Sequence, residues 1–235
     1  MAATRLPGKP LLKINNLSII SHVFKRAEEA NIGEVVVATE DQDIIADVQK
    51  NGGRAILTNN NHKTGTDRIF EAYEKLNIKN VDYILNLQGD EPDINKDDII
   101  NLNNFMINQD AELGTLAAKI QDDKMLNNRN IVKVITDKKL AENNFPTALN
   151  FTRDNLLTDS QNIYHHIGIY SYKVSVLEKF VSLDQTNNEK KNKLEQLRAL
   201  DNRLKINVAL AKSSPIGVDS NEDYLAIKKI MEYKI

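Results

Sequence analysis

Two basic residues near the start of the chain, Arg5 and Lys9, have the types and spacing that suit phosphate binding. They lie in "TRLPGKP", where Pro7 and Pro10 stiffen the loop and Gly8 lets backbone N–H groups approach a ligand. The Arg5 guanidinium offers a planar fork of donors and the Lys9 ammonium a compact charge, and both match phosphate oxygens. On spacing alone, a basic surface loop is an equally good interpretation.

Two carboxylates in glycine-containing segments are candidates for holding a divalent metal. Asp90 follows the apolar run "VDYILNLQ", and Asp219 lies in "PIGVDSNED". Carboxylates from distant segments can share Mg²⁺, and phosphoryl and nucleotidyl transfer require the charge neutralisation that this ion supplies. The alternatives are local: Asp90 caps the turn that follows it, and Asp219 with Ser220 caps the last helix.

A pair of histidines, His165 and His166, lies in "HHIGIYSY". Successive residues of a strand face opposite sides, so at most one of the two faces a ligand. A hydrogen-bonded structural histidine is the alternative for either. The chain contains no Cys, and no spacing matches a hydrolase triad or a zinc site.

Hydrophobic periodicity predicts the elements that position these residues. Over the first half, strand and helix signals alternate, which is the pattern of a doubly wound, mostly parallel α/β sheet. In such sheets, ligands bind at the carboxyl ends of the strands. The predicted elements are helices 17–31, 41–50, 69–76 and 95–108 and strands 34–39, 54–58 and 81–88.

After residue 113 the pattern changes to strands with less helix between them. A smaller mixed α+β part therefore follows the doubly wound part. The predicted strands are 114–120, 130–136, 165–173 and 205–210, and the predicted helices are 174–183, 189–203 and 221–233.

The composition bounds the class of protein. The 235 residues are 41% hydrophobic and 27% charged with a net charge of −2, which is typical of a globular protein. Nothing marks the chain as a nucleic-acid or membrane-surface binder, and no apolar run approaches the roughly 18 residues that span a membrane. Without Cys or a recognisable secretory leader, a cytoplasmic protein is expected.

Nine segments together resemble one family, the 3-deoxy-D-manno-octulosonate (Kdo) cytidylyltransferases, also called CMP-Kdo synthetases. The resemblance covers nearly the whole chain, and the combination of "LPGKP", "QGDEP", "HxGIY" and "LEQLR" is specific. CMP-sialic acid synthetases share the fold and the basic loop, but "LEQLR" and "HxGIY" are more similar to the Kdo enzyme. The segments, in order, are "TRLPGKPL", "VVVATED", "HKTGTDRI", "NLQGDEP", "NIVKV", "FTR", "HHIGIYSY", "LEQLRAL" and "GVD".

The resemblance implies a single nucleotidyltransferase domain, 1–235, and a reaction. CTP and Kdo give CMP-Kdo and pyrophosphate with Mg²⁺ as cofactor, in lipopolysaccharide synthesis, by a homodimer. The nucleotide-binding part is about 1–113, the sugar-binding and dimerisation part about 114–205, and the closing strand and helix 206–235. A cytidylyltransferase for another 2-keto sugar acid, such as sialic acid, is the alternative enzyme.

Roles carry over residue by residue as implications of the resemblance. Arg5, Lys9 and Asp90 are the implied catalytic residues, and Asp90 and Asp219 the implied metal ligands. Arg5 and Lys9, with Ala38, Thr39, Thr64, Gly65 and Thr66, are the implied nucleotide-binding residues. Gln88, Arg153, His166 and Glu195 are the implied sugar-binding residues, with Arg153 facing the sugar carboxylate; His166 matches the family histidine because it lies two residues before Gly168.

Three departures from the family accompany the match. The family has a strand and a Pro-Ala-Arg turn ahead of the basic loop, and neither precedes Thr4 here. From this departure we expect the chain as given to be inactive or nearly so and less stable than a form that carries them, and a non-catalytic remnant is the alternative. The other departures are "DNLLTD" after Arg153, in place of Ile-Pro-Trp, and the polar "NNEKKNK" before "LEQLR", where the family usually has Pro-Leu-Glu and a further Glu.

Overall fold

The computed structural model describes residues 6–154 and 162–233. They divide into two compact units, which we describe separately. The first unit comprises Met1–Lys79, Leu87–Ile99 and Pro215–Ile235, and the second comprises Asn80–Asn86 and Ile100–Ser214. Within the described part, no helix has both the length and the apolar character that crossing a membrane requires.

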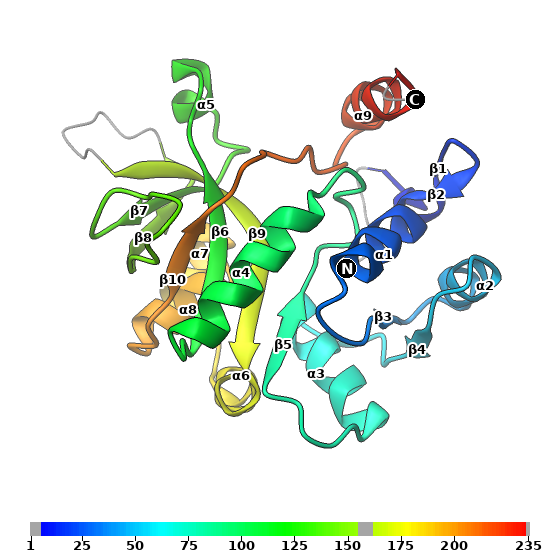
Figure 1. The fold of residues 1–235 in the computed structure, drawn as a ribbon, viewed down its shortest axis with the longest axis horizontal. Coiled ribbons are helices and arrows are strands. Elements are labelled where there is room, and N and C mark those ends of the chain that lie inside the picture. Colours follow the sequence, from blue (N-terminus) through cyan, green and yellow to red (C-terminus); the bar gives the residue numbers. More distant parts are fainter. Residues whose placement is uncertain (1–5, 155–161, 234–235) are drawn as a thin grey trace. The chain divides into compact units, whose positions relative to one another are not determined.

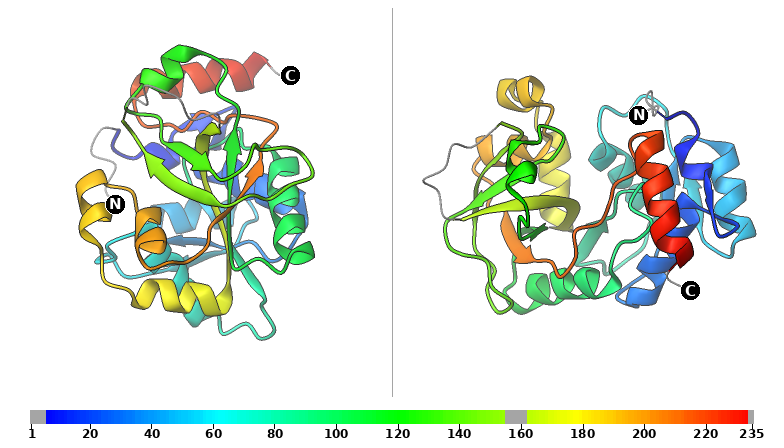
Figure 2. Two further views of the ribbon diagram at one scale, coloured as in Figure 1. Left: turned by 90° about the vertical axis from the view of Figure 1, so that its left-hand side faces the viewer. Right: turned by 90° about the horizontal axis from the view of Figure 1, so that it is seen from above.

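The first unit is built from short strands and amphipathic helices. β3 and β4 pair in parallel, and β1 and β2 form an antiparallel hairpin. One apolar cluster joins the hairpin and α1 to α9 through Ile14, Ile19, Ile227 and Met231, and Figure 2 shows α9 beside this amino-terminal segment. The elements are η1 (Lys9–Leu11), β1 (Lys13–Ile14), β2 (Leu17–Ser18), α1 (Ile19–Ala30), β3 (Val37–Thr39), α2 (Gln42–Lys50), β4 (Ala55–Leu57), α3 (Gly65–Leu76) and α9 (Asn221–Tyr233).

A six-stranded sheet forms the second unit, in the order β10-β6-β9-β7-β8, with β5 also paired to β9 (Figure 1). β6 is buried along its whole length. The elements are β5 (Tyr83–Asn86), β6 (Leu113–Ala118), α5 (Asp123–Asn127), β7 (Lys133–Thr136), β8 (Ala148–Thr152), β9 (Ile163–Lys173), α6 (Val174–Ser182), α7 (Asn187–Asn192), α8 (Gln196–Asp201) and β10 (Asn207–Leu210); α4 (Lys96–Asn108) begins in the first unit and continues into the second.

The α/β class predicted from the sequence is confirmed, and the pairing of the second unit adds a feature that the periodicity did not predict. β10 runs parallel to β6, but β9 runs antiparallel to β5, β6 and β7, so this sheet is mixed. With 11 residues, β9 is long enough to pair with three neighbours. It also carries both histidines and therefore determines where they lie.

Most predicted elements differ from the structure by up to four residues at an end, and two of the predicted helices show a physical reason. The helix expected at 17–31 begins at Ile19, because Leu17 and Ser18 pair in the hairpin and the Ser18 hydroxyl caps the helix by accepting from Ser21 N–H. The single helix predicted at 189–203 is wrong. The chain forms α7 and α8 instead, and Lys193, at φ 53°, ends α7 in the left-handed conformation. β8 and α5 were not predicted.

Gly114 lies in β6 where the sheet meets α4, and a methyl group does not fit there. A Cβ at this position would lie 2.5 Å from Met106 Sδ and 2.7 Å from Phe145 Cζ. We expect Gly114→Ala to lower the free energy of unfolding by about 1–3 kcal/mol, because overpacking forces neighbours off their rotamers. Urea unfolding measures the loss.

Gly33→Ala is the matched control for this substitution. A Cβ at Gly33 would have no heavy atom within 4 Å. The change should therefore alter the free energy of unfolding by no more than about 0.5 kcal/mol. Equal effects of the two substitutions would contradict the packing argument.

Candidate active site

Three charged residues from distant parts of the chain meet in the first unit. Lys9 Nζ lies 2.7 Å from Asp90 Oδ2 and 3.2 Å from Asp219 Oδ1. It also donates to the backbone carbonyl of Val218 at 2.8 Å. The candidate phosphate-binding lysine and both candidate metal ligands are therefore brought together.

Backbone contacts hold the segments of this cluster in place. Val218 N–H donates to Asp90 O at 2.9 Å, which ties the "QGDEP" turn to "GVD". Gly8, with φ 70°, takes the left-handed conformation that starts η1 and sets the position of Lys9. Val218 is fully buried in the same apolar cluster as Ile14 and Ile19, so the core of this unit anchors the carbonyl that Lys9 contacts.

Charge stabilises the protonated form of Lys9. Partial burial lowers the pKa of Lys9, but the Asp90 carboxylate and, more weakly, Asp219 outweigh it, so the net pKa lies above the ordinary 10.5. Lys9 is therefore an ammonium ion at neutral pH, held by three oxygen atoms.

The donor set at this point suits Mg²⁺, since carboxylate and carbonyl oxygens are the ligands of hard cations. Among the described residues, no group of three or more His, Asp or Glu side chains is arranged to hold a metal. The neighbouring Glu91 adds no third charge: burial, assisted by Asp90, raises the pKa of Glu91 to about 8. Two carboxylates are enough for Mg²⁺ when substrate phosphates and water complete its shell.

The described candidate nucleotide-binding residues, apart from Lys9, lie at the end of β3 and at the start of α3. Ala38 and Thr39 belong to β3. Thr64 caps α3 in a reciprocal pair with Asp67, and Gly65 and Thr66 form the first turn of that helix. A helix amino-terminus with exposed N–H groups is a favourable place for an anion.

Arg68, which the sequence analysis did not single out, connects these segments. Its guanidinium bonds Thr58 Oγ1 at 2.6 Å and Asn59 O at 3.1 Å and pairs with Glu40 Oε2 at 2.6 Å. One side chain thus ties "ATED", the end of β4 and α3 together. Its signal in the sequence was its place within the "HKTGTDRI" segment.

The second unit places His166 among aromatic side chains. His166 is 7% exposed, and its ring lies 5.0 Å from Phe151 and 5.5 Å from Tyr170, centroid to centroid. Burial lowers the pKa of His166 to about 3, and the positive charges of His165 and Arg153 contribute. The imidazole is therefore neutral at neutral pH.

A hydrogen bond to Thr115 defines the tautomer of this neutral ring. The Thr115 hydroxyl has one hydrogen, and its shortest contact is to Ile169 O at 2.7 Å. It therefore accepts from His166 Nε2, 3.0 Å away. Nδ1 then carries the lone pair and is a hydrogen-bond acceptor. The neighbouring His165 lies on the opposite side of β9, where its Nδ1 is 2.7 Å from Ser214 Oγ.

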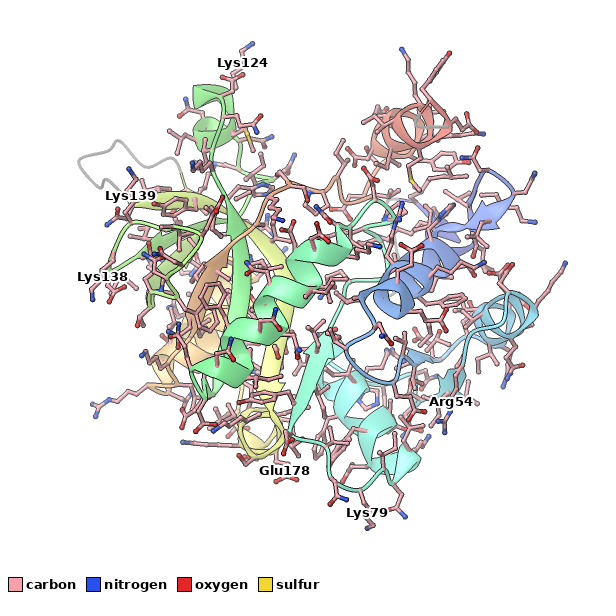
Figure 3. All side chains as sticks on the ribbon, viewed as in Figure 1. Arg54, Lys79, Lys124, Lys138, Lys139 and Glu178 are labelled. Carbon is pink, nitrogen blue, oxygen red and sulfur yellow. The ribbon has the colours of Figure 1, made fainter. Side chains whose placement is uncertain are left out.

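Arg153 follows β8 and is fixed to a neighbouring loop by its own side chain and by the side chain of Lys133 in β7. Its Nη1 donates to Asn130 O at 2.8 Å, and the buried Lys133 Nζ donates to Asn128 O at 2.9 Å and to Arg153 O at 3.2 Å. Figure 3 shows Lys138 and Lys139 projecting outward from the same unit, whereas Lys133 is fully buried. Burial lowers the pKa of Lys133. The loop at 128–130 and the Arg153 backbone are thus held as one piece.

Glu195 precedes α8 beside a buried ion pair. Arg198 donates to both carboxylate oxygens of Glu189, at 2.9 and 2.7 Å, and its guanidinium lies 4.7 Å from the Phe180 ring centroid. Glu195 Oε1 lies 3.9 Å from the same guanidinium. Tyr170 lies near this carboxylate as well: burial raises its pKa well above 10, and the charges of Tyr172 and Glu195 add to the rise.

The sequence-derived candidates are thus distributed over the two units. Lys9, Asp90 and Asp219 meet in the first unit, where Gln88 is exposed two residues before Asp90. Arg153, His166 and Glu195 belong to the second. Arg5 lies outside the described residues. Sequence reasoning missed Arg68, Thr115, Lys133 and Tyr170, which contact or surround the candidates.

Comparison with known proteins adds independent evidence. The profile of the cytidylyltransferase family matches residues 1–206. The chain is 42% identical to the 3-deoxy-manno-octulosonate cytidylyltransferase of Thermodesulfovibrio yellowstonii, over 97% of this chain and 94% of the relative. It is 41% identical to the protein of that name from Rhodopseudomonas palustris strain BisB18, over 99% and 95%.

Solved structures agree with these matches. The structure of CMP:2-keto-3-deoxy-manno-octonic acid synthetase complexed with CTP has a TM-score of 0.88 and 33% identity, over 99% of this chain and 95% of that one. Apo UDP-glucose pyrophosphorylase has a TM-score of 0.70 at 12% identity, over 100% and 96%, and shares the fold alone.

The fold and the cluster of a basic loop with two carboxylates define a nucleotidyltransferase, as the family resemblance implied. Within that class, identities near 40% over almost the whole chain are decisive. The chain belongs to the 3-deoxy-manno-octulosonate cytidylyltransferases of the cytidylyltransferase family.

Glu71 lies beside the nucleotide-binding segments, and its contacts should make the free energy of unfolding depend on pH. It bonds Lys75 at 2.6 Å, His62, and Asn59 N–H at 2.9 Å, and these partners outweigh burial and lower the pKa of Glu71 to about 2. A lowered pKa stabilises the fold fully above about pH 4.5, and this contribution is lost as pH falls toward 2. Glu71→Gln should lower the free energy of unfolding by about 1–2 kcal/mol at pH 7. This value is less than the full pKa shift would give, because Lys75 is half exposed and solvent weakens its interaction with Glu71.

Urea unfolding at pH 7 and pH 3 tests this expectation. The difference between Glu71→Gln and the unsubstituted protein should be smaller at pH 3. Glu74→Gln, on the exposed side of α3, is the matched control and should have little effect at either pH. A pH-independent loss for Glu71→Gln would contradict the electrostatic account.

Proposed function

We propose that this protein transfers CMP from CTP to the anomeric hydroxyl of 3-deoxy-D-manno-octulosonate, giving CMP-Kdo and pyrophosphate. The observation that carries the proposal is the meeting of Lys9 with Asp90 and Asp219 in a chain of this family. A cation and two carboxylates at one point are what a metal-bound triphosphate requires. The names of the relatives favour Kdo over sialic acid as the sugar.

In the proposed reaction, the anomeric oxygen forms a bond to the α-phosphorus of CTP while the bond from that phosphorus to the bridging β-oxygen breaks. Pyrophosphate leaves with the electron pair, and the hydroxyl proton passes to solvent or a base. Lys9, with Arg5, binds the triphosphate and stabilises the charge that develops on the leaving group. The cytidine end binds at the Ala38–Thr39 and Thr64–Thr66 segments.

Magnesium is the proposed cofactor, and Asp90 and Asp219 are the residues that would hold it. The oxygen atoms that surround the Lys9 ammonium support this assignment, because the protein already places a cation there. When bound, Mg²⁺ neutralises phosphate charge and makes phosphorus a better electrophile.

The sugar acid binds Arg153, His166 and Glu195 of the second unit, and the family resemblance implies Gln88 as a further sugar-binding residue. The fixed Arg153 backbone supports a role in recognising the Kdo carboxylate, for which a guanidinium fork is suited. Neutral His166 accepts a hydrogen bond from a sugar hydroxyl through Nδ1. Glu195, held near Arg198, accepts another.

Three further parts of the proposal rest on the family resemblance. The protein works as a homodimer, in the cytoplasm where CTP is made, and supplies CMP-Kdo for lipopolysaccharide synthesis. Sedimentation equilibrium tests the first of these. The central test of the reaction is pyrophosphate release from CTP with a panel of sugar acids; release with Kdo should exceed release with sialic acid by orders of magnitude.

Asp90→Asn should lower turnover by about 100-fold or more, since it removes one of two charges that hold the metal. The asparagine is isosteric, so the melting temperature should change little. Asp184→Asn, an exposed aspartate of the second unit, is the control and should keep full turnover. Near-normal turnover of Asp90→Asn would falsify the metal assignment.

Arg153→Lys should weaken the binding of the sugar acid while CTP binding stays close to normal. The substitution keeps the charge and removes the planar fork, which we expect to cost on the order of 2 kcal/mol, or roughly 30-fold in the KM for Kdo. Steady-state kinetics with each substrate varied in turn measure the split. Equal changes in both KM values would instead assign Arg153 a structural role at the 128–130 loop.

A further inference from the structure

The contacts of Lys9 conflict with a permanent role in phosphate binding. An ammonium group has three N–H donors. In the structure all three have acceptors: Asp90 Oδ2 at 2.7 Å, Val218 O at 2.8 Å and Asp219 Oδ1 at 3.2 Å. Lys9 can donate to a phosphate oxygen only if it leaves at least one of these partners.

The same oxygen atoms are the donor set assigned above to the divalent ion. Two carboxylates carry two negative charges, and one ammonium neutralises half of that. A divalent cation would neutralise all of it at shorter distances, since Mg²⁺ binds oxygen at about 2.1 Å. Two cations cannot occupy this position together, because like charges a few ångströms apart repel strongly.

We infer that the Lys9 ammonium is a stand-in cation, which holds Asp90 and Asp219 together until a divalent ion displaces it toward the triphosphate. The inference rests on the proposed function and adds an exchange of partners to it. Lys9 competes with the metal before CTP arrives and joins the triphosphate afterwards. The side chain is suited to this movement, because it is a flexible chain of methylenes rising from a glycine-initiated turn.

The exchange has a consequence opposite to that expected of a residue that only assists catalysis. With Lys9 in place, a metal alone must displace a charge-assisted contact before it binds. Removing the ammonium should therefore strengthen metal binding in the absence of nucleotide. A lysine that serves only to support the fold, away from the carboxylates, would not produce this gain.

Binding of Mn²⁺ alone to the full chain, followed by the electron paramagnetic resonance signal of the free ion, tests the inference. Lys9→Met should bind Mn²⁺ about tenfold more tightly than the unsubstituted protein, the factor expected from losing one charge-assisted competitor. Lys9→Arg, which keeps a cation, should not gain. Lys13→Met, which removes an exposed lysine from β1 of the same unit, should leave Mn²⁺ affinity unchanged.

Thermal stability gives a second readout that does not depend on activity. Lys9→Met leaves two carboxylates close together, so its melting temperature without metal should fall. Mn²⁺ should then raise that temperature more than it does in the unsubstituted protein, because at a given Mn²⁺ concentration tighter binding stabilises the folded state more. A marginally stable variant thus still reports on the exchange.

The outcomes separate this inference from the proposed function. If Asp90→Asn weakens Mn²⁺ binding while Lys9→Met leaves it unchanged or weaker, the metal site stands and the exchange is wrong. If Asp90→Asn does not affect Mn²⁺ binding, or if neither the protein nor Lys9→Met binds Mn²⁺, the metal assignment fails and the exchange fails with it. Tighter Mn²⁺ binding by Lys9→Met but not by Lys9→Arg or Lys13→Met, together with weaker binding by Asp90→Asn, supports both.

Discussion

The contact between the Lys9 ammonium and the Asp90 carboxylate is the interaction on which the first unit's site depends. It joins residues 81 positions apart, and the neighbouring contact to Val218 O spans 209 positions. Apolar packing of Ile14, Ile19 and Val218 brings the segments together, and the charge pair orders their polar ends. Two carboxylates this close would repel one another without a cation, so the geometry of the two candidate metal ligands depends on the position of the lysine.

In the second unit, burial rather than a cluster of charges sets the properties of the candidate binding residues. His166 is neutral because it is buried, and Thr115 defines which nitrogen carries its proton. Lys133 is a buried lysine whose Nζ donates to two backbone carbonyls, and its contact with Arg153 O fixes the backbone there; without such partners this polar group would be costly to bury. Polar groups that are expensive to bury therefore surround the candidate sugar-binding residues, which are oriented before any ligand arrives.

Features set by local sequence could be predicted, whereas features set by contacts between distant residues could not. The strand ends and their glycine-containing turns follow from local patterns, and so Asp90 and Asp219 were identified as candidates. The break between α7 and α8 was not predicted, because Lys193 adopts φ 53° without the glycine or asparagine that usually marks such a helix end. Lys133 was missed because a lysine inside a strand pattern is normally taken as exposed, and only the fold supplies its carbonyl partners.

The pairing of charges across the fold is the property that a linear pattern cannot express. A sequence shows that Lys9 is basic and that Asp90 and Asp219 are acidic, and each of these alone has a local explanation such as a surface loop or a helix cap. The fold places both carboxylates within 3.2 Å of the Lys9 ammonium, so the three charges constrain one another. Because all three donors of Lys9 already have acceptors, the residue cannot also be a fixed phosphate-binding lysine. The chemistry assigned to a residue type therefore has to be checked against what that residue already binds.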